Sequence, residues 1–565
     1  MHSPPETFLQ KDAGLVDRKA EPSVTRALGW LAKSRGQGTR PRPFFLWLHL
    51  YDPHSPYDPP EPYLTNYRDH LYDGEIAYAD HELGRLVTWL KRNQIYDRTL
   101  IVAVSDHGES LGEHGESEHG FFVYNSTVRI PLILKPPAGS GFPPSHIARP
   151  VETTSVAPTL LQLAGLKDDI QKQFTSSPLL EQSKLRQAKL EQKSEDDQPA
   201  YSETFYTFNS FGWSPLHSLE TTRYHYIDAP RPELFDLSAA PDEKNNLAPQ
   251  QTATVAVLKE KLQALLRRDP FKASSVTNVG VTPEAAEKLR ALGYVAYHSP
   301  IPPEAIATGL PDPKDKLQEF NTILSAQDAI RVGKFQDGEQ LLAKVQQQDP
   351  QMYIVPFMLG LAASKQKDWP KSEAALKRCL ELNPNFDQAM TGLARALFFQ
   401  GKDEEAKQWA RNALKLNPAD YKALYELASI ESRTDTAAAI ADYEKALALQ
   451  SNFAPLRREL GMLYFKQQNY SQAAVELAKA VELGLRDARL LNFLGICYDR
   501  TNRVQQAIST YRQALQLDDN LPEAHLNLGY TYHREGREDL AKREYQRACE
   551  LKQDFCKLVG LGKAD

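Results

Sequence analysis

Cysteine is scarce in this chain of 565 residues, and so are long apolar runs and any excess of positive charge. The four cysteines are Cys379, Cys497, Cys549 and Cys556, and all of them lie in the last third of the sequence. They fall at positions expected to be helical, where single buried thiols commonly act as small hydrophobic side chains. The cysteines therefore identify no redox compartment.

The sequence also lacks the features that mark membrane and nucleic-acid-binding proteins. No segment approaches the roughly 18 apolar residues that a membrane-spanning helix needs, so no membrane span is predicted. The first thirty residues lack the apolar core of a signal peptide. The net charge is -6 and no basic stripe stands out along the chain, which gives no electrostatic reason to expect nucleic acid as a partner.

The overall composition is that of a soluble protein with several domains. Hydrophobic residues make up 41% of the chain and charged residues 25%. Domains of about 150 residues are typical, so this length predicts about three or four of them.

Residues 99 to 120 contain the densest group of chemically capable side chains in the sequence. The apolar run from Leu100 to Val104 has strand length, and the loop after it carries three histidines among five carboxylates. Open α/β sheets carry their sites on loops at the carboxyl ends of buried parallel strands. Asp106 and His107 are therefore candidate metal ligands. The alternative is a solvated turn whose acidic residues only keep the loop in water.

A second candidate loop follows the apolar run from Phe44 to Leu50, which we also expect to be a strand. Residues 51 to 60 contain four prolines, which exclude a helix and restrict the backbone. Such a rigid loop can hold His54 toward a site, as an acid or an anion ligand. His49 lies within the expected strand and is better interpreted as a core residue.

Several stretches of the chain, taken in order, resemble the sulfatase family of the alkaline phosphatase superfamily. They are PFFLWLHLYDPHSPYDPP, the expected helix DGEIAYADHELGRLVTWLKRN that begins at Asp73, the expected strand and loop TLIVAVSDHGESLGEHG, EHGFFVYNSTVRIPLILKPP and VETTSVAPTLLQLAGL. Residues 201 to 248 resemble the smaller carboxyl-terminal subdomain of that family. The resemblance covers most of residues 20 to 300 and implies an α/β fold.

The resemblance also implies roles for four residues. It makes Asp106 and His107 metal ligands, and it makes His54 and His119 contacts to the transferred group or the leaving oxygen. Many sulfatases have Asp-Asn at the metal and a lysine where His119 stands, so this sequence departs toward phosphate- and phosphonate-cleaving relatives. A carboxylate and an imidazole favour a divalent metal, with calcium as the first choice and magnesium, manganese or zinc as alternatives.

The family's nucleophile motif, Cys/Ser-x-Pro-x-Arg, does not occur in this chain. The first strand of the family, which supplies further metal-binding aspartates, is also absent, and Asp168 and Asp169 follow an expected helix and cannot replace it. Covalent catalysis needs an activated nucleophile beside its metal or base. We therefore expect the chain to be a truncated sulfatase sequence that is inactive alone and holds metal weakly. The family implies a periplasmic or secreted parent protein, but the localisation of this chain stays unknown.

From about residue 319 the sequence repeats with a period of 34 residues. Equivalent leucines are separated by 34, 33, 34, 34 and 34 residues, and they are Leu382, Leu416, Leu449, Leu483, Leu517 and Leu551. Gly461, Gly495 and Gly529 recur with the same period. This pattern is typical of tetratricopeptide (TPR) repeats and predicts an all-α solenoid of about seven helix pairs. Such arrays commonly bind a peptide or protein in a groove; the alternative is an array that only dimerises or spaces domains.

The sequence predicts an α/β sulfatase-like domain, lacking its amino-terminal strands, followed by an all-α TPR solenoid. The expected parts are a partial catalytic domain at 1–166, a polar linker or insertion at 167–200, a carboxyl-terminal subdomain at 201–297, a Pro-rich linker at 298–316 and TPR repeats at 317–565. Two classes of function follow. One is a metal-dependent sulfuric-ester hydrolase that acts on a sulfate ester once an amino-terminal segment completes it. The other is a binding scaffold with a non-catalytic sulfatase-like part.

Overall fold

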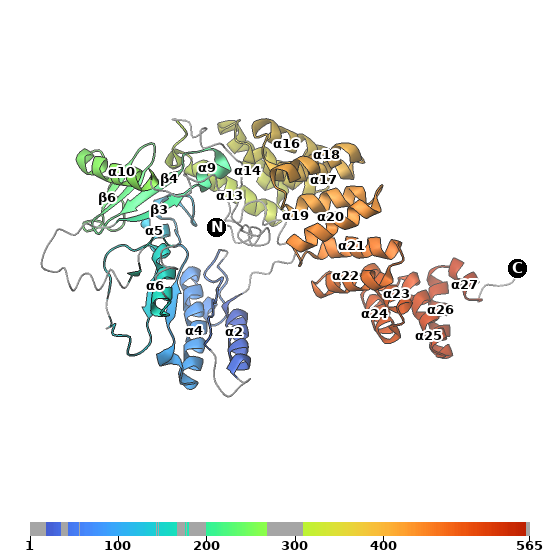
Figure 1. Cartoon of the computed structure of the whole chain (residues 1–565). Helices are drawn as coiled ribbons and strands as arrows, with labels where there is room; N and C mark the ends of the chain where they lie inside the picture. Colours follow the sequence, from blue (N-terminus) through green and yellow to red (C-terminus); the bar gives the residue numbers. More distant parts are fainter. Residues whose placement is uncertain are drawn as a thin grey trace. The chain divides into compact units, whose positions relative to one another are not determined.

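The computed structural model describes most of the chain in two compact units. The described residues are 19–35, 43–55, 57–142, 144, 146–166, 174, 176, 178–179, 199–267 and 309–560. The first unit contains the described residues up to 267 together with 309–325, and the second contains 326–560 (Figure 1). Among the described helices, none combines the length and the apolar character that crossing a bilayer requires. The sequence also predicts a short helix near Thr282 to Gly293, and a frayed helix or disordered insertion at 181–198; both lie outside the described residues.

Within its described residues, the first unit combines helices of four to 22 residues with two small sheets. Its helices are α2 (Ala20–Arg35), α3 (Tyr63–Asn66), α4 (Leu71–Arg92), α5 (Asn125–Val128), α6 (Val156–Leu163), α9 (Tyr206–Phe211) and α10 (Thr252–Arg267). Its strands are β1 (Ile101–Val104), β2 (Leu132–Lys135), β3 (Ala200–Thr204), β4 (Leu216–Glu220), β5 (Tyr224–Asp228) and β6 (Glu233–Asp236).

The first sheet pairs β1 with β2, and the two strands run antiparallel. The expectation of a buried parallel strand before Asp106 is therefore wrong in both respects, since β1 is antiparallel and Val104 is 44% exposed. The strand expected from Phe44 to Leu50 is also wrong, because this run forms no strand. Phe45 is 76% exposed and Trp47 81% exposed. A strand needs a hydrogen-bonded neighbour, and within the described residues β1 pairs with β2 alone.

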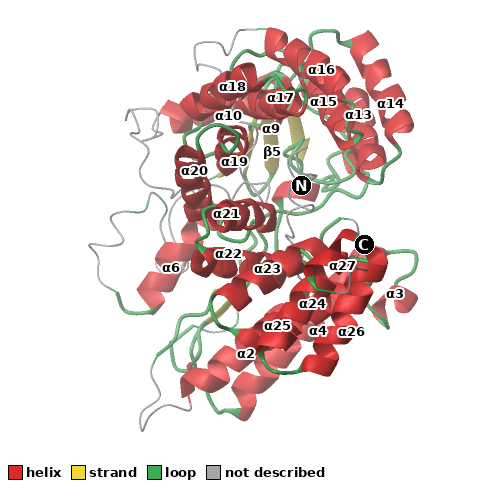
Figure 2. Ribbon diagram, turned by 90° about the vertical axis from the view of Figure 1, so that its right-hand side faces the viewer, coloured by secondary structure: helices red, strands yellow, loops and turns green. Residues whose placement is uncertain are grey.

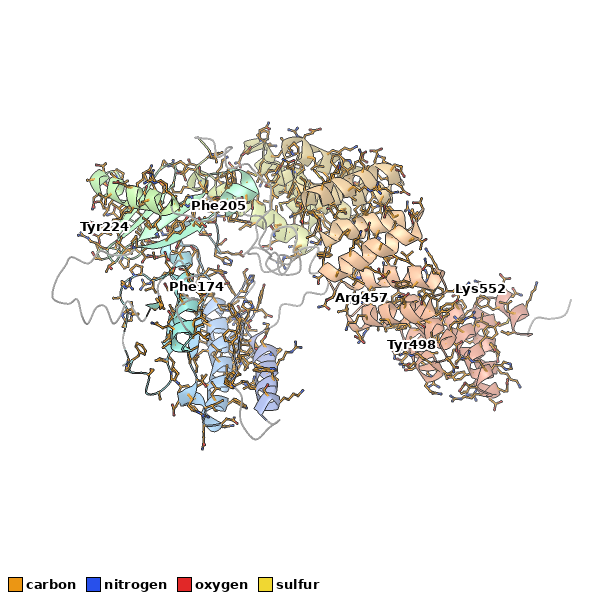
Figure 3. All side chains as sticks on the ribbon, viewed as in Figure 1. Phe174, Phe205, Tyr224, Arg457, Tyr498 and Lys552 are labelled. Carbon is orange, nitrogen blue, oxygen red and sulfur yellow. A yellow bond between two sulfur atoms is a disulfide. The ribbon has the colours of Figure 1, made fainter. Side chains whose placement is uncertain are left out.

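The second sheet is an antiparallel meander in the order β3, β4, β5, β6. Leu219 of β4, Tyr226 of β5 and Leu234 of β6 are neighbours across the strands and are fully buried. They pack with Leu258 and Leu262 of α10. Because successive strand residues point to opposite faces, one face of the sheet forms this core. Tyr224 lies at the start of β5, and Phe205 lies between β3 and α9 (Figure 3).

Part of the Pro-rich linker is held against the second sheet of the first unit. The backbone N–H of Arg231 donates to the Asp312 carboxylate at 3.1 Å, and the Arg231 guanidinium donates to Asp315 at 2.6 Å. Farther along, the Phe320 ring stacks on the Phe121 ring with centroids 4.2 Å apart. Residues 309–325 therefore pack as part of this unit and do not form a free spacer.

Within residues 309–560, all of which are described, the chain forms seven successive helix pairs and one short terminal helix (Figure 2). The pairs are α13 (Leu317–Arg331) and α14 (Phe335–Gln348), α15 (Ile354–Lys365) and α16 (Trp369–Leu382), α17 (Asp387–Phe399) and α18 (Asp403–Leu416), α19 (Tyr421–Glu431) and α20 (Thr436–Leu449), α21 (Ala454–Lys466) and α22 (Tyr470–Glu482), α23 (Ala488–Arg500) and α24 (Val504–Leu517), and α25 (Pro522–Arg534) and α26 (Glu538–Leu551), followed by α27 (Asp554–Leu558). The expected all-α solenoid is confirmed.

The repeated glycines allow the two helices of a pair to approach closely. A Cβ added at Gly495 of α23 would lie 2.5 Å from the Tyr511 ring of α24, and one at Gly461 would lie 2.7 Å from Leu477. Both distances are shorter than a van der Waals contact, so a larger side chain would force the helices apart. The recurrence of glycine in the sequence thus reflects the close packing of the two helices in each pair.

The cysteines divide into two kinds. Cys379 and Cys497 are fully buried free thiols, as expected, and burial raises the pKa of the Cys497 thiol to about 12. Cys549 of α26 and Cys556 of α27 instead form a disulfide with their Cα atoms 4.8 Å apart. The expectation of single buried thiols is wrong for this pair, because the turn after α26 brings Cys556 of α27 next to Cys549. The disulfide ties α27 to the last repeat.

Candidate functional site

Two buried carboxylates hold the loop that carries His54. Asp52 accepts a hydrogen bond from the Ala20 backbone N–H at 2.6 Å, at the first turn of α2. Glu75 of α4 is 2% exposed and accepts from the backbone N–H groups of His54 at 2.9 Å and Asp58 at 2.8 Å. Burial raises the pKa of Glu75, although the two N–H donors act in the opposite direction. The loop is therefore fixed to α4 on both sides of Pro56.

The His54 ring is fixed by its Nδ1 atom. This atom lies 2.6 Å from the Ser55 carbonyl oxygen and 2.9 Å from the Tyr51 hydroxyl, and the Tyr51 ring stacks on the imidazole at 4.3 Å. A carbonyl oxygen only accepts, so Nδ1 carries the proton in the neutral ring. The Nε2 atom of His54 then carries a lone pair and can bind a proton or a cation.

Asp106 and His107 follow directly after β1. The His107 Nδ1 atom donates to the Gly108 carbonyl oxygen at 2.8 Å, which again assigns the lone pair to Nε2. That Nε2 atom lies 3.6 Å from Oδ2 of Asp106. Gly108 is required here because an added Cβ would lie 2.4 Å from the Ser126 carbonyl oxygen. The backbone of the loop therefore passes too close to its neighbour for any other residue.

His119 is oriented by a carboxylate from its own loop. Its Nδ1 atom lies 2.7 Å from Oε1 of Glu109, and the two side chains are only 3% and 5% exposed. A second buried carboxylate of this loop, Glu116, is 1% exposed and accepts from the backbone N–H of Phe121 at 2.8 Å. Burial raises the pKa of Glu116 to about 8, so this side chain is protonated at neutral pH. Together these contacts hold the loop around His119.

The structure brings the three predicted imidazoles together. The His107 and His119 rings stack with centroids 3.8 Å apart, and the His54 ring meets His119 edge-on at 6.3 Å. The remaining histidine of the loop, His114, stacks on Tyr124 at 3.7 Å, and burial lowers its pKa. His54, Asp106, His107 and His119 thus form one cluster that excludes His114.

The donor atoms of this cluster fit part of a metal site. Asp106 Oδ2 and His107 Nε2 lie 3.6 Å apart, a separation compatible with two ligands of one ion, since metal–ligand bonds are about 2.0 to 2.6 Å long. Within the described residues, however, no group of three or more His, Cys, Asp or Glu side chains is arranged to hold a metal ion. Two ligands alone would hold an ion weakly.

Sequence reasoning did not identify two residues that shape this site. Glu109 was one of five carboxylates in the loop, and its place three residues after Asp106 gave no sign that it faces His119. Glu75 lies in a helix that was correctly expected, but an acidic residue on a helix is usually solvated. Its position next to Gly74, where an added Cβ would lie 3.0 Å from Pro59, was the available signal for close approach to the loop.

Comparisons with known proteins match the two parts of the chain to different families. A family model described as Sulfatase matches residues 17–166, and one described as N-sulphoglucosamine sulphohydrolase, C-terminal, matches residues 112–268. Models described as TPR or tetratricopeptide repeats match residues 323–387, 363–430, 496–536 and 522–555.

Three curated relatives cover the sulfatase-like part. Choline-sulfatase of Rhizobium meliloti is 31% identical over 36% of this chain and 38% of the relative. A sulfatase of Formosa agariphila is 31% identical over 31% of each protein, and arylsulfatase K of Xenopus laevis is 27% identical over 36% of this chain and 38% of the relative. The chain thus spans less than two fifths of the length of these relatives.

A solved structure similar to the repeat part is described as YrrB, a TPR protein with an unusual peptide-binding site. It is 22% identical with a TM-score of 0.32, and the match covers 33% of this chain and 97% of that protein.

Proposed function

The amino-terminal part of this chain is sulfatase-family sequence and its carboxyl-terminal part is a TPR array, and from this premise we propose a metal-dependent sulfuric-ester hydrolase that also binds a protein partner. The observation that carries the proposal is the cluster of His54, His107 and His119, in which each Nδ1 atom has a hydrogen-bonding partner. Anchored imidazoles of this kind present Nε2 to a ligand in a fixed orientation.

The proposed roles follow from the geometry and from the relatives. Asp106 and His107 would hold a divalent metal, with calcium first among the candidates, and the metal would polarise an ester oxygen. His54 and His119 would contact the transferred group, and Glu109 would keep His119 in the required tautomer. The nucleophile and the remaining metal carboxylates would come from polypeptide outside residues 1–565.

A second candidate reaction in the same superfamily is hydrolysis of a phosphate or phosphonate ester. The observation that favours it is the Asp106-His107 pair, where many sulfatases have Asp-Asn. An imidazole ligand shifts the metal preference from the hard ions toward later ions such as zinc. Sulfate and phosphate esters of the same alcohol, assayed side by side with the completed protein, would discriminate between the two reactions.

We further propose that residues 1–565 alone are inactive. The purified chain is expected to hydrolyse neither 4-methylumbelliferyl sulfate nor the phosphate above a metal-only blank. The proposal fails if turnover is seen that Asp106→Ala abolishes and Asp80→Ala does not; Asp80 is an exposed residue of α4 and serves as the control. Detection of product by fluorescence at high enzyme concentration makes the assay sensitive enough for either outcome.

Metal binding gives a test that does not depend on activity. Calorimetric titration of the chain with Ca²⁺, Mn²⁺ and Zn²⁺ is expected to show weak binding that His107→Ala removes. Tight binding of one equivalent would contradict the two-ligand arrangement, and binding unchanged by His107→Ala would contradict the assignment of this residue. His146→Ala, an exposed histidine outside the cluster, is the matched control.

The competing class is a scaffold in which only the TPR array acts. The observation that favours it is the size of that array, seven helix pairs within the described residues 309–560. Under this alternative, substitution of Asp106 or His107 in the completed protein leaves its biological role unchanged, whereas substitutions on the array abolish it.

A further inference from the structure

The loop that carries His119, residues 109–121, closes on itself. The backbone N–H of Ser110 donates to the Glu118 carbonyl oxygen at 2.8 Å. Glu109 and His119 directly flank this pair, and their side chains lie 2.7 Å apart. The contact between the carboxylate and the imidazole therefore depends on the loop staying closed. This raises the question of what holds the His119 loop in its closed form.

The tip of the His119 loop is held by the first turns of α13. An added Cβ at Gly115 would lie 2.6 Å from Cδ2 of Leu317, so the Leu317 side chain packs directly on the Gly115 backbone. The Asn321 side-chain amide donates to the Gly115 carbonyl oxygen at 3.2 Å. Leu317 and Asn321 are four residues apart, which places them on the same side of the helix. One side of α13 thus contacts the loop tip twice.

A third side chain of α13 holds the base of the same loop. Phe320 is 4% exposed, and its ring stacks on the Phe121 ring with centroids 4.2 Å apart. Phe121 is itself fully buried and lies two residues after His119. Because so short a segment separates them, a displacement of the Phe121 ring would move the backbone that carries His119. The base and the tip of the loop are therefore both in contact with α13.

The start of α13 is fixed within the first unit. The backbone N–H of Ser214 donates to the Pro311 carbonyl oxygen at 2.9 Å, just before this helix. The Phe320 ring also meets the Phe211 ring of α9 edge-on at 5.9 Å, so α13 begins beside α9 (Figure 1). Residues 309–325 belong to the same compact unit as the His119 loop. The side chains that contact the loop therefore project from a fixed support.

We propose that Leu317, Phe320 and Asn321 are positioning residues of the candidate hydrolase site. They hold the His119 loop in the form that brings His119 against Glu109. The three residues belong to the first helix of the repeat array, so this helix is part of the support of the site. The inference rests on the proposed function, in which His119 contacts the transferred group.

The alternative is that Phe320 only fills the core beside α9. Its ring also meets the Tyr206 ring at 6.0 Å, so loss of the Phe320 ring would weaken this core in either case. The hydrogen bond from Asn321 favours the positioning role, because it ends on the loop tip itself. A role in packing alone predicts no change in the surroundings of the His119 imidazole, and this difference gives the test.

Hydrogen–deuterium exchange of the full chain, followed by mass spectrometry, measures how often the loop opens. In peptides that cover residues 109–121, Phe320→Ala is expected to speed exchange about tenfold or more, and Asn321→Ala about two- to tenfold, because each removes a contact that closes the loop. The matched controls are Phe357→Ala, which removes a ring of α15 that is 2% exposed, and Gln318→Ala, at an exposed residue of α13. Both controls are expected to exchange like the wild type in these peptides.

The imidazole signals give a readout that a loss of packing alone would not change. The chain contains 14 histidines, so the full chain labelled with ¹³C at the ε1 carbon of histidine gives a simple spectrum, and His119→Gln identifies the signal of His119. In the wild type the ring current of the stacked His107 ring is expected to displace this signal. Phe320→Ala and Asn321→Ala are expected to move it toward the position of a free imidazole, and the two controls are not.

Faster exchange of residues 109–121 together with a moved His119 signal in both α13 variants, and neither change in the controls, supports the inference. Faster exchange with an unchanged His119 signal shows that α13 only packs, and this result overturns the positioning role. An equal effect of Phe357→Ala, or no effect of Asn321→Ala, overturns it as well. Since Asn321→Ala removes a single partly exposed side chain, it decides the question even if Phe320→Ala fails to fold.

The outcome also separates this inference from the function on which it rests, because both measurements are made without substrate or metal. If the α13 variants change the loop but the completed protein hydrolyses neither a sulfate nor a phosphate ester, the proposed function is refuted and the support of His119 by α13 stands. If the completed protein is active and neither variant changes the loop, the inference is refuted and the proposed function stands.

Discussion

Glu75 has no part in the proposed chemistry, yet two backbone N–H groups from the His54 loop converge on its carboxylate. Each of these partly buried donors would lose its partner if the carboxylate were removed. An unsatisfied buried donor costs about 1 to 3 kcal/mol. At the scale of single residues, the His54 loop is thus held in place by a carboxylate that takes no part in the proposed chemistry, and not by the imidazole rings.

Replacing Glu75 should therefore cost more than replacing an exposed acidic residue of the same helix. Glu75→Ala is expected to lower the free energy of unfolding by on the order of 2 kcal/mol, and Glu75→Gln by less, because the amide oxygen still accepts a hydrogen bond. Asp80→Ala is the control and should change stability by less than about 0.5 kcal/mol. Urea unfolding monitored by tryptophan fluorescence measures these differences; equal effects of Glu75→Ala and Asp80→Ala would refute the positioning role.

The buried carboxyl group of Glu116 makes the stability of the fold depend on pH. Its pKa is raised from 4.5 to about 8 in the folded state, so folding retains a proton that the unfolded chain loses above about pH 4.5. Stability then falls as the pH rises from about 4.5 to 8 and changes little beyond that range. Glu116→Gln should remove this loss, so its melting temperature should exceed that of the wild type by more at pH 8 than at pH 5.

A second variant controls for nonspecific effects on the same loop. Backbone N–H groups lower the pKa of Glu113, whose contribution to stability is instead lost as the pH falls below its normal range. The difference between Glu113→Gln and the wild type should therefore stay constant between pH 5 and pH 8. If the difference in melting temperature between Glu116→Gln and the wild type became smaller at high pH, this result would contradict burial as the cause of the raised pKa of Glu116.

The candidate site could be predicted from the sequence as far as the identity of its residues. His54, Asp106, His107 and His119 were each marked by a loop after an apolar run or by the family pattern, and the structure brings them together. The partner of His119 could not be predicted, because the spacing of five carboxylates in a short loop does not determine which one faces the ring.

At the scale of elements, what could be predicted depends on whether an element's partners lie nearby in the chain. The helix pairs follow from the 34-residue period, since each helix packs on the next one along the sequence. The helix expected after Asp73 is confirmed as α4 for the same reason: its amphipathic pattern is local. The run from Phe44 to Leu50 has strand composition but forms no strand, because strand formation depends on a distant neighbour.

The glycines of the repeats allow a graded test of helix packing. A Cβ at Gly495 would lie 2.5 Å from the Tyr511 ring, whereas one at Gly392 would lie 3.2 Å from the flexible end of Leu376. Gly495→Leu is therefore expected to cost on the order of 1 to 3 kcal/mol or more. Gly392→Ala should be nearly neutral, because alanine gains up to about 1 kcal/mol of helix propensity over glycine.

Circular dichroism melts of the repeat region, residues 353–565, measure both effects. This fragment begins with α15 and is expected to fold alone, since each repeat buries its apolar face on its neighbours. A melt of Gly495→Leu that equals the wild type would refute the close approach of α23 and α24. An unfolded wild-type fragment would refute the independence of the array.

For the whole molecule, the exposed apolar side chains of the first unit predict poor solubility. Phe45, Trp47 and Ile133 are 76%, 81% and 64% exposed, respectively, and Ile133 lies in the two-stranded sheet of β1 and β2. Exposed apolar surface and unpaired strand edges promote aggregation. A fragment of residues 1–300 is therefore expected to aggregate or to be cleaved rapidly by protease unless further polypeptide covers this surface.

Size-exclusion chromatography and limited proteolysis test this expectation. Phe45→Ser with Trp47→Ser should increase the soluble fraction. The control is Val257→Ser in α10, where the apolar side chain is 55% exposed, and it should not increase the soluble fraction. A monomeric fragment that melts cooperatively would show that the first unit closes its own core.

The packing of each repeat helix on its neighbours along the chain also determines how the array can form. Most contacts join residues that are close in sequence, so the loop-closure entropy lost before a contact forms is small. Chains of low contact order fold within microseconds to milliseconds, and folding can start at any repeat. As the chain leaves the ribosome, each helix pair can therefore fold on the one already made, before the last repeats have emerged.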